Sequence, residues 1–109
     1  MTVAELKTAL SLEPLCLPDP EREVTGGYTG DLLSWVMGSV EEGDAWVTIM
    51  SNINVIAVAS LREVACVVLA AGVTLEEKDL QTAAEKEINV LSSPLQAFEL
   101  CNLIGEALK

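Results

Sequence analysis

In the second half of the chain, the pattern of apolar and polar residues alternates between one typical of strands and one typical of helices. The segment "AWVTIM" (residues 45–50) is rich in β-branched and aromatic residues and predicts a strand. The segment "ACVVLAAG" (65–72) is a continuous apolar run that ends in glycine, which predicts a buried strand. The segment "INVLSS" (88–93) predicts the next strand.

Helical patterns lie between and after these strands. The valine and isoleucine content of residues 54–62 favours a strand, but we interpret this segment as a helix because Ser51, Asn52 and Asn54 supply caps. The segment "TLEEKDLQTAAEKE" (74–87) predicts an amphipathic helix capped by Thr74. The segment "SPLQAFELCNLIGEAL" (93–108) predicts the last helix, with Ser93 as N-cap and Pro94 in the first turn.

The first half of the chain has a less regular pattern. Thr2 and Glu5 have the spacing of a capping box, which predicts a helix over "TVAELKTAL" (2–10). A short extended piece follows over "LEPLCLP" (12–18), then a strand over "REVTG" (22–26) and a helix over "DLLSWVMGSV" (31–40), capped by Asp31. Because strands and helices alternate in the second half, we expect a single α/β domain over residues 1–109, with a mainly parallel sheet flanked by helices.

Composition and charge narrow the classes of function. Half of the residues are apolar, and six basic against seventeen acidic residues give a net charge of −11. Such a chain repels nucleic acid and anionic membranes, so we expect neither as a partner. No leader peptide and no apolar run of about 18 residues is visible, and we expect a cytoplasmic protein.

The residue types that most catalytic and metal sites need are scarce. The chain has no histidine, and its three cysteines lie far apart, so we expect no metal site and no cofactor. A serine or cysteine nucleophile with a histidine base is excluded, and no acid–base pair stands out among the seventeen acids. We therefore expect that the protein is not an enzyme.

The glycine-rich stretch "VTGGYTG" (24–30) has the look of a phosphate-binding loop. A P-loop ends in Gly-Lys-Ser/Thr, whereas this one ends in Gly30–Asp31–Leu32. A carboxylate at the helix start would repel a phosphate and occupy the free amides. We expect Gly26, Gly27 and Gly30 to allow positive φ angles and the close approach of backbone segments.

Two segments carry a resemblance to a known family. "VTGGYTGDLLSWVMG" (24–38) is similar to the glycine turn before the first long helix of the DRTGG domain family, and residues 45–100 resemble its core. In that family the two central strands end in Gly-Asp-Arg and Thr-Gly-Gly, where this chain has Ser51–Asn52–Ile53 and Ala70–Ala71–Gly72. The resemblance implies a fold similar to the amino-terminal domain of HPr kinase. DRTGG domains occur as regulatory segments beside CBS domains in certain pyrophosphatases, within some phosphotransacetylases, and as small free-standing proteins.

Candidate ligand-binding residues follow from the rule that ligands of open parallel sheets lie beyond the carboxyl ends of the strands. The residues at those ends are small, polar and uncharged: Ser51, Asn52, Gly72 and Ser92. Asn52 is also a natural helix cap, and the sequence leaves both roles open.

These observations favour a non-catalytic regulatory or protein-interaction module that acts through self-association or with a neighbouring enzyme. A sensor of a small ligand, either a nucleotide or an anion, is the alternative. We expect a homodimer because a small domain with so many apolar residues exposes part of them. The candidate interface residues are Trp35 and Met37 on the first long helix and Val55 and Val58 on the next, although Trp35 could equally pack in the core of the monomer.

Overall fold

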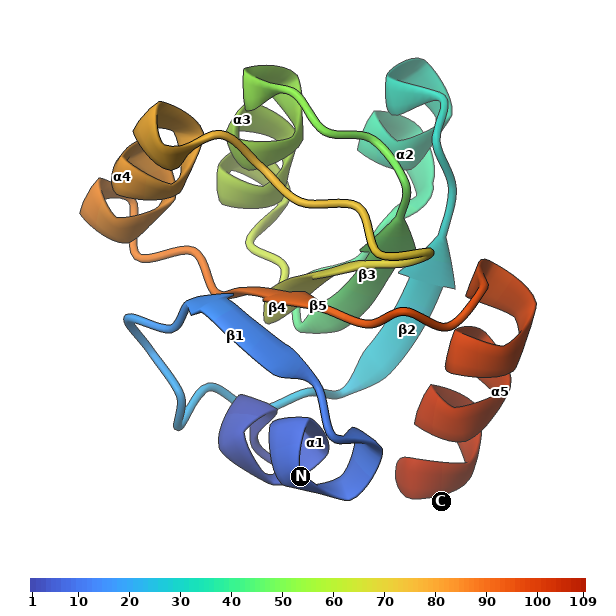
Figure 1. Cartoon of the computed structure of the whole chain (residues 1–109). Helices are drawn as coiled ribbons and strands as arrows, with labels where there is room; N and C mark the ends of the chain where they lie inside the picture. The colour runs from blue at the N-terminus through green and yellow to red at the C-terminus, as the bar shows by residue number, and fades with distance from the viewer.

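The computed structural model describes all 109 residues, which form five helices and five strands. In chain order these elements are α1 (Val3–Leu10), β1 (Glu13–Cys16), β2 (Gly26–Thr29), α2 (Leu33–Ser39), β3 (Asp44–Thr48), α3 (Ile53–Arg62), β4 (Cys66–Leu69), α4 (Glu77–Glu85), β5 (Val90–Ser92) and α5 (Ala97–Ala107) (Figure 1). None of the helices has the length and apolar content needed to cross a membrane.

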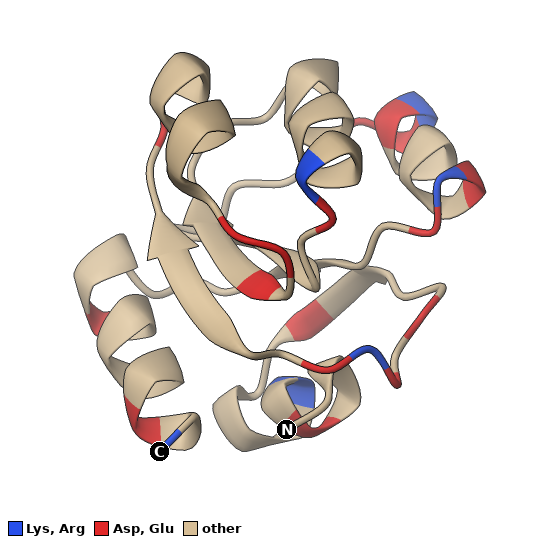
Figure 2. Cartoon of the chain, turned by 180° about the vertical axis from the view of Figure 1, so that it is seen from behind, with Lys and Arg blue, Asp and Glu red and all other residues tan.

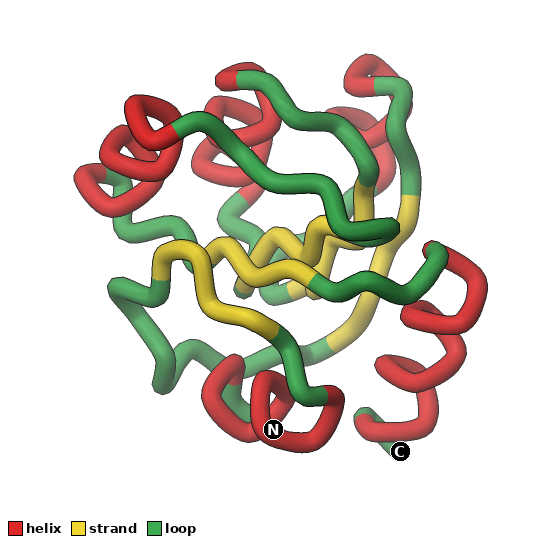
Figure 3. Tube along the Cα trace, viewed as in Figure 1, coloured by secondary structure: helices red, strands yellow, loops and turns green.

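The sheet has the strand order β1-β5-β4-β3-β2. Strands β2 to β5 are parallel and each pairs with the next one in the chain, while β1 is antiparallel to β5 at the far edge. Helices α2, α3 and α4 cover one face, and α1 and α5 cover the other (Figures 1 and 3). The predicted α/β fold with a mainly parallel sheet is confirmed.

The sheet separates two apolar cores, which is why its central strands are buried along their whole length. The core under α2, α3 and α4 is built around Trp46, whose indole Nε1 donates to the carbonyl of Gly30 at 3.0 Å. The core on the other face packs Leu6 of α1 and Leu100 of α5 against the sheet. The two free edges of the sheet are therefore β1 and β2.

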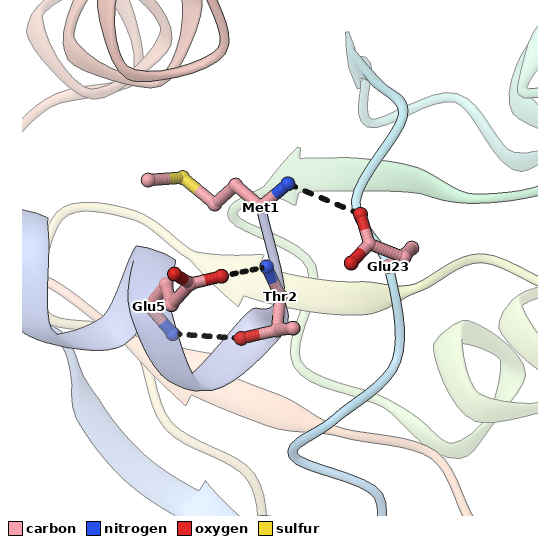
Figure 4. A network of polar contacts seen from close by, with 4 residues as sticks. All are labelled: Met1, Thr2, Glu5 and Glu23. Carbon is pink, nitrogen blue, oxygen red and sulfur yellow. Dashed lines mark hydrogen bonds and ion pairs between the residues drawn. The ribbon is translucent and has the colours of Figure 1, made fainter.

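Helix α1 begins with the capping box that the sequence predicts. Thr2 Oγ1 accepts from the backbone amide of Glu5 at 3.1 Å, and the Glu5 carboxylate accepts from the amide of Thr2 at 2.8 Å (Figure 4). The backbone amide of Thr2 thereby lowers the pKa of Glu5, with a second contribution from the Thr2 hydroxyl. The amino group of Met1 pairs with Glu23 at 3.1 Å and so holds the chain that leads into β2.

The prediction of a strand over "REVTG" (22–26) is wrong, because the strand in this region is β2, which begins at Gly26. Glu23 makes only an isolated bridge with Thr2, whereas Gly26 to Thr29 pair with Asp44 to Val47. A Cβ on Gly26 would stand 2.7 Å from Asp44 Oδ1, so the pairing at this point requires glycine. None of Gly26, Gly27 and Gly30 has a positive φ angle, and the expected left-handed turn is corrected to an extended edge strand.

Three of the predicted helix caps are wrong, and their helices begin two to four residues later. The carboxylate of Asp31 accepts from Thr48 Oγ1 and the amide of Ile49, so it ties the loop before α2 to the end of β3. Ser93 Oγ accepts from the amide of Leu95 within a turn, before α5 begins at Ala97. Thr74 lies outside α4, which follows Glu76. The Asn52 cap is confirmed, because its Oδ1 accepts from the amide of Asn54 at 2.9 Å.

Candidate functional site

A shallow hollow of about 400 Å³ lies at the carboxyl ends of β4 and β5, beside the start of β1. Gly72 and Ser92, two of the four ligand-binding residues expected from the sequence, line it together with Ser93 and Thr74. The remaining lining residues are Ser11, Glu13, Leu15, Val73 and Pro94. The hydroxyl groups make this a polar surface depression that offers hydrogen bonds to a ligand.

The turn after β4 is bound tightly to the turn after β5. Gly72 has φ +73°, a left-handed conformation that favours glycine, and its amide donates to the carbonyl of Ser93 at 2.9 Å. The amide of Ala71 donates to the carbonyl of Leu95 at 2.7 Å. Because these two amides are used inside the protein, they are not free to bind an anion.

Ser51 and Asn52 do not line this hollow. They follow β3, and β4 lies between β3 and β5 in the sheet. Both residues are exposed, and the side chain of Asn52 is engaged in capping α3. The four expected residues therefore do not form one site.

The electrostatics of the hollow disfavour a phosphate. Glu13 is the one charged residue in its lining, and neither lysine nor arginine lines it. A phosphate site needs several free amides aimed at one point and usually a basic side chain. The hollow also does not coincide with a topological switch point, because β2 to β5 follow one another in chain order along the sheet.

The four expected interface residues divide between the surface and the core. Trp35 is 69% exposed and Met37 is 37% exposed, so both lie on the surface of α2. Val55 is 0% exposed and Val58 is 9% exposed, because the inner face of α3 packs on the sheet. The expectation for these two valines is corrected, since the monomer core already covers them.

The edge strand β2 and helix α2 form an uncharged side of the molecule. Between Val24 and Val40 the single charged residue is Asp31, whereas acidic residues are spread over the rest of the molecule, including α5 beside β2 (Figure 2). The large exposed apolar side chains here include Leu32 just before α2, Trp35 on α2 and Phe98 on α5, the last of them 85% exposed. Phe98 is not among the interface residues expected from the sequence.

The fold is shared with a solved regulatory protein. One matching structure is that of the CBS and DRTGG domains of the regulatory region of Clostridium perfringens pyrophosphatase, complexed with the activator diadenosine tetraphosphate. The TM-score is 0.72 at 16% sequence identity, over 94% of this chain and 45% of that one. The fold is DRTGG-like. The resemblance stated from the sequence is thereby confirmed at the level of the fold.

This chain spans a little under half of the regulatory region that it matches. No protein-family model matches the sequence, and no curated protein matches it well enough to count as a relative.

Proposed function

We propose that the protein is a non-catalytic regulatory module that acts by binding protein, in the first place a second copy of itself. The observation that carries this proposal is the uncharged, partly apolar side around β2 on a molecule of net charge −11. Interface centres are depleted in charge and enriched in aromatic residues and methionine, and Trp35, Met37 and Phe98 are of this kind.

Long-range repulsion between two acidic copies favours association through this side. Two copies with a charge of −11 each repel one another wherever their acidic faces meet. The repulsion is smallest when the uncharged sides face one another, since the acids then point away from the contact. A homodimer is therefore the association that this charge distribution favours.

The similar fold within the regulatory region of a pyrophosphatase supports a regulatory role. A module of this fold would act on a neighbouring enzyme through protein contacts. A dimer presents two copies of any such contact surface.

Sedimentation equilibrium of the purified protein at micromolar concentration tests the proposal. We expect a mass near twice the 11.6 kDa of the chain. A mass of one chain across the concentration range would contradict self-association.

A sensor of a nucleotide or another small anion is the second candidate function. It is favoured by the hollow at Gly72 and Ser92 and by the nucleotide activator bound to the matching regulatory region. Glu13 and the absence of basic lining residues weigh against it.

Thermal-shift measurements with ATP and with diadenosine tetraphosphate separate the two candidates. We expect no change in Tm, because a polyphosphate placed in the hollow would meet the Glu13 carboxylate and no basic side chain. A saturable rise in Tm that Ser92→Ala abolishes would favour the sensor.

A further inference from the structure

A second, apolar groove of about 240 Å³ runs between helix α5 and the edge strand β2. Its lining residues are Gly27, Tyr28, Thr29, Ala45, Val47, Cys101, Ile104, Gly105 and Leu108, none of them charged. The groove borders the uncharged strand β2, which is a free edge of the sheet.

Two glycines account for the hollow shape of the groove. A Cβ built on Gly105 would meet no atom within 4 Å, so a side chain is missing there and the space stays open. Across the groove, a Cβ on Gly27 would reach ordinary contact with Ile104 at 3.7 Å. Glycine inside a helix is less favourable than alanine, and Gly105 lies inside α5 without any steric need for glycine in the monomer.

Phe98 lies on the same side of α5 as Gly105. The two residues are seven positions apart, which is two helical turns or about 10 Å along the axis. The inner face of the helix is formed by Leu100 and Ile104, and Phe98 is left 85% exposed. One stripe of α5 therefore presents a projecting aromatic ring at one end and a groove at the other.

We propose that the groove receives Phe98 of a second copy of this chain, in a two-fold dimer whose α5 helices pack antiparallel. In an isologous contact each copy supplies the same patch, so Phe98 of one copy meets Gly105 of the other and the reverse. A cavity of about 150 Å³ accommodates benzene, so a groove of about 240 Å³ has room for the ring. The inference rests on the proposed self-association and gives it a location.

The charge pattern of α5 favours a second copy over a basic partner. Glu99 and Glu106 are also seven residues apart, and they lie about 100° around the helix from the stripe of Phe98 and Gly105. The apolar centre of the contact therefore holds no carboxylate with which a basic protein could pair, and the glutamates of both copies flank it. A standard interface buries about 800 Å² per partner, which is about a seventh of the 5640 Å² surface of this chain and fits one side of it.

The two-fold arrangement makes a geometric prediction for Cys101. The midpoint between Phe98 and Gly105 falls at Cys101 and Asn102, so Cys101 of each copy lies near the two-fold axis. Cys101 lines the groove and is partly exposed, whereas Cys66 is fully buried. A short bis-maleimide added to a Cys16→Ser variant should therefore join two chains through Cys101.

Sedimentation equilibrium of matched variants tests the interface. Phe98→Ala removes the ring, and Gly105→Leu fills the groove where the monomer has open space, so both variants keep the fold. We expect each to raise the dimer Kd at least about tenfold. Leu61→Ala, a matched truncation of an apolar side chain on α3 that is 69% exposed, should leave the Kd within about threefold of the wild-type value.

The outcomes separate this inference from the proposed function. A wild-type mass of one chain at every concentration overturns both. A wild-type dimer that Phe98→Ala and Gly105→Leu leave intact overturns the α5 contact alone, as does a dimer that Leu61→Ala dissociates while Phe98→Ala does not. A dimer that yields no cross-link through Cys101 overturns the antiparallel arrangement.

Discussion

Single polar side chains fix the irregular segments of this protein. Asn89, 2% exposed, accepts from the amide of Asp19 at 2.9 Å and donates to the carbonyls of Asp19 and Ala65. It thereby ties the loop between β1 and β2 to the entrance of β5. Asp44 at the start of β3 accepts from the amide of Glu41 at 2.9 Å and leaves no room for a side chain at Gly26. Such long-range partners leave no local pattern in a sequence.

Cys66 gives the stability of the protein a dependence on alkaline pH. Burial raises the pKa of its thiol from 9.0 to about 12. Above pH 9 the unfolded chain loses the thiol proton while the folded protein retains it, so the free energy of unfolding falls as pH rises through this window. The loss attributable to this thiol at pH 10 is about 1 kcal/mol.

Urea unfolding of the wild type and of Cys66→Ala at pH 8 and pH 10 measures this contribution. The variant is less stable at both pH values because it leaves a small cavity, but its stability should fall less between them. Equal falls in the two proteins would contradict the assignment.

At the scale of elements, the sequence predicts the type of each element in the second half but not where the helices begin. Strands β3, β4 and β5 are buried along their whole length and consist mainly of apolar residues, a pattern typical of the central strands of a parallel sheet. The strand β2 was missed because "GGYT" has low strand propensity, and its pairing with β3 depends on Asp44 and Ala45 far along the chain. Asp31 and Ser93 are good caps by type, but tertiary and turn contacts take their oxygen atoms.

The Asn52 cap of helix α3, which the sequence predicts correctly, can be tested by mutation. Asn52→Ala should lower the free energy of unfolding by about 1 kcal/mol, because the amide of Asn54 loses its acceptor. Asn54→Ala is the matched control, since it removes an exposed amide side chain two residues away and retains the backbone amide. Urea unfolding measures both, and equal stabilities of the two variants would argue against the cap.

At the scale of the whole molecule, the uncharged side follows from how the topology places segments. The chain order puts β2 at an edge of the sheet, α2 over one face beside it and α5 over the other (Figure 1). The sequence shows that residues 24–40 carry one charge, but it does not show that α5 returns from β5 to lie along β2. For the same reason the sequence did not separate Ser51 and Asn52 from the hollow at Gly72 and Ser92.

Sedimentation equilibrium in low and high salt tests most directly the claim that the module associates with itself through its uncharged side. We expect a mass near twice 11.6 kDa at micromolar concentration, and a lower dimer Kd at 0.5 M than at 0.05 M salt, because salt screens the repulsion between two chains of charge −11. A mass of 11.6 kDa at both salt concentrations, or a dimer that high salt dissociates, would contradict the account.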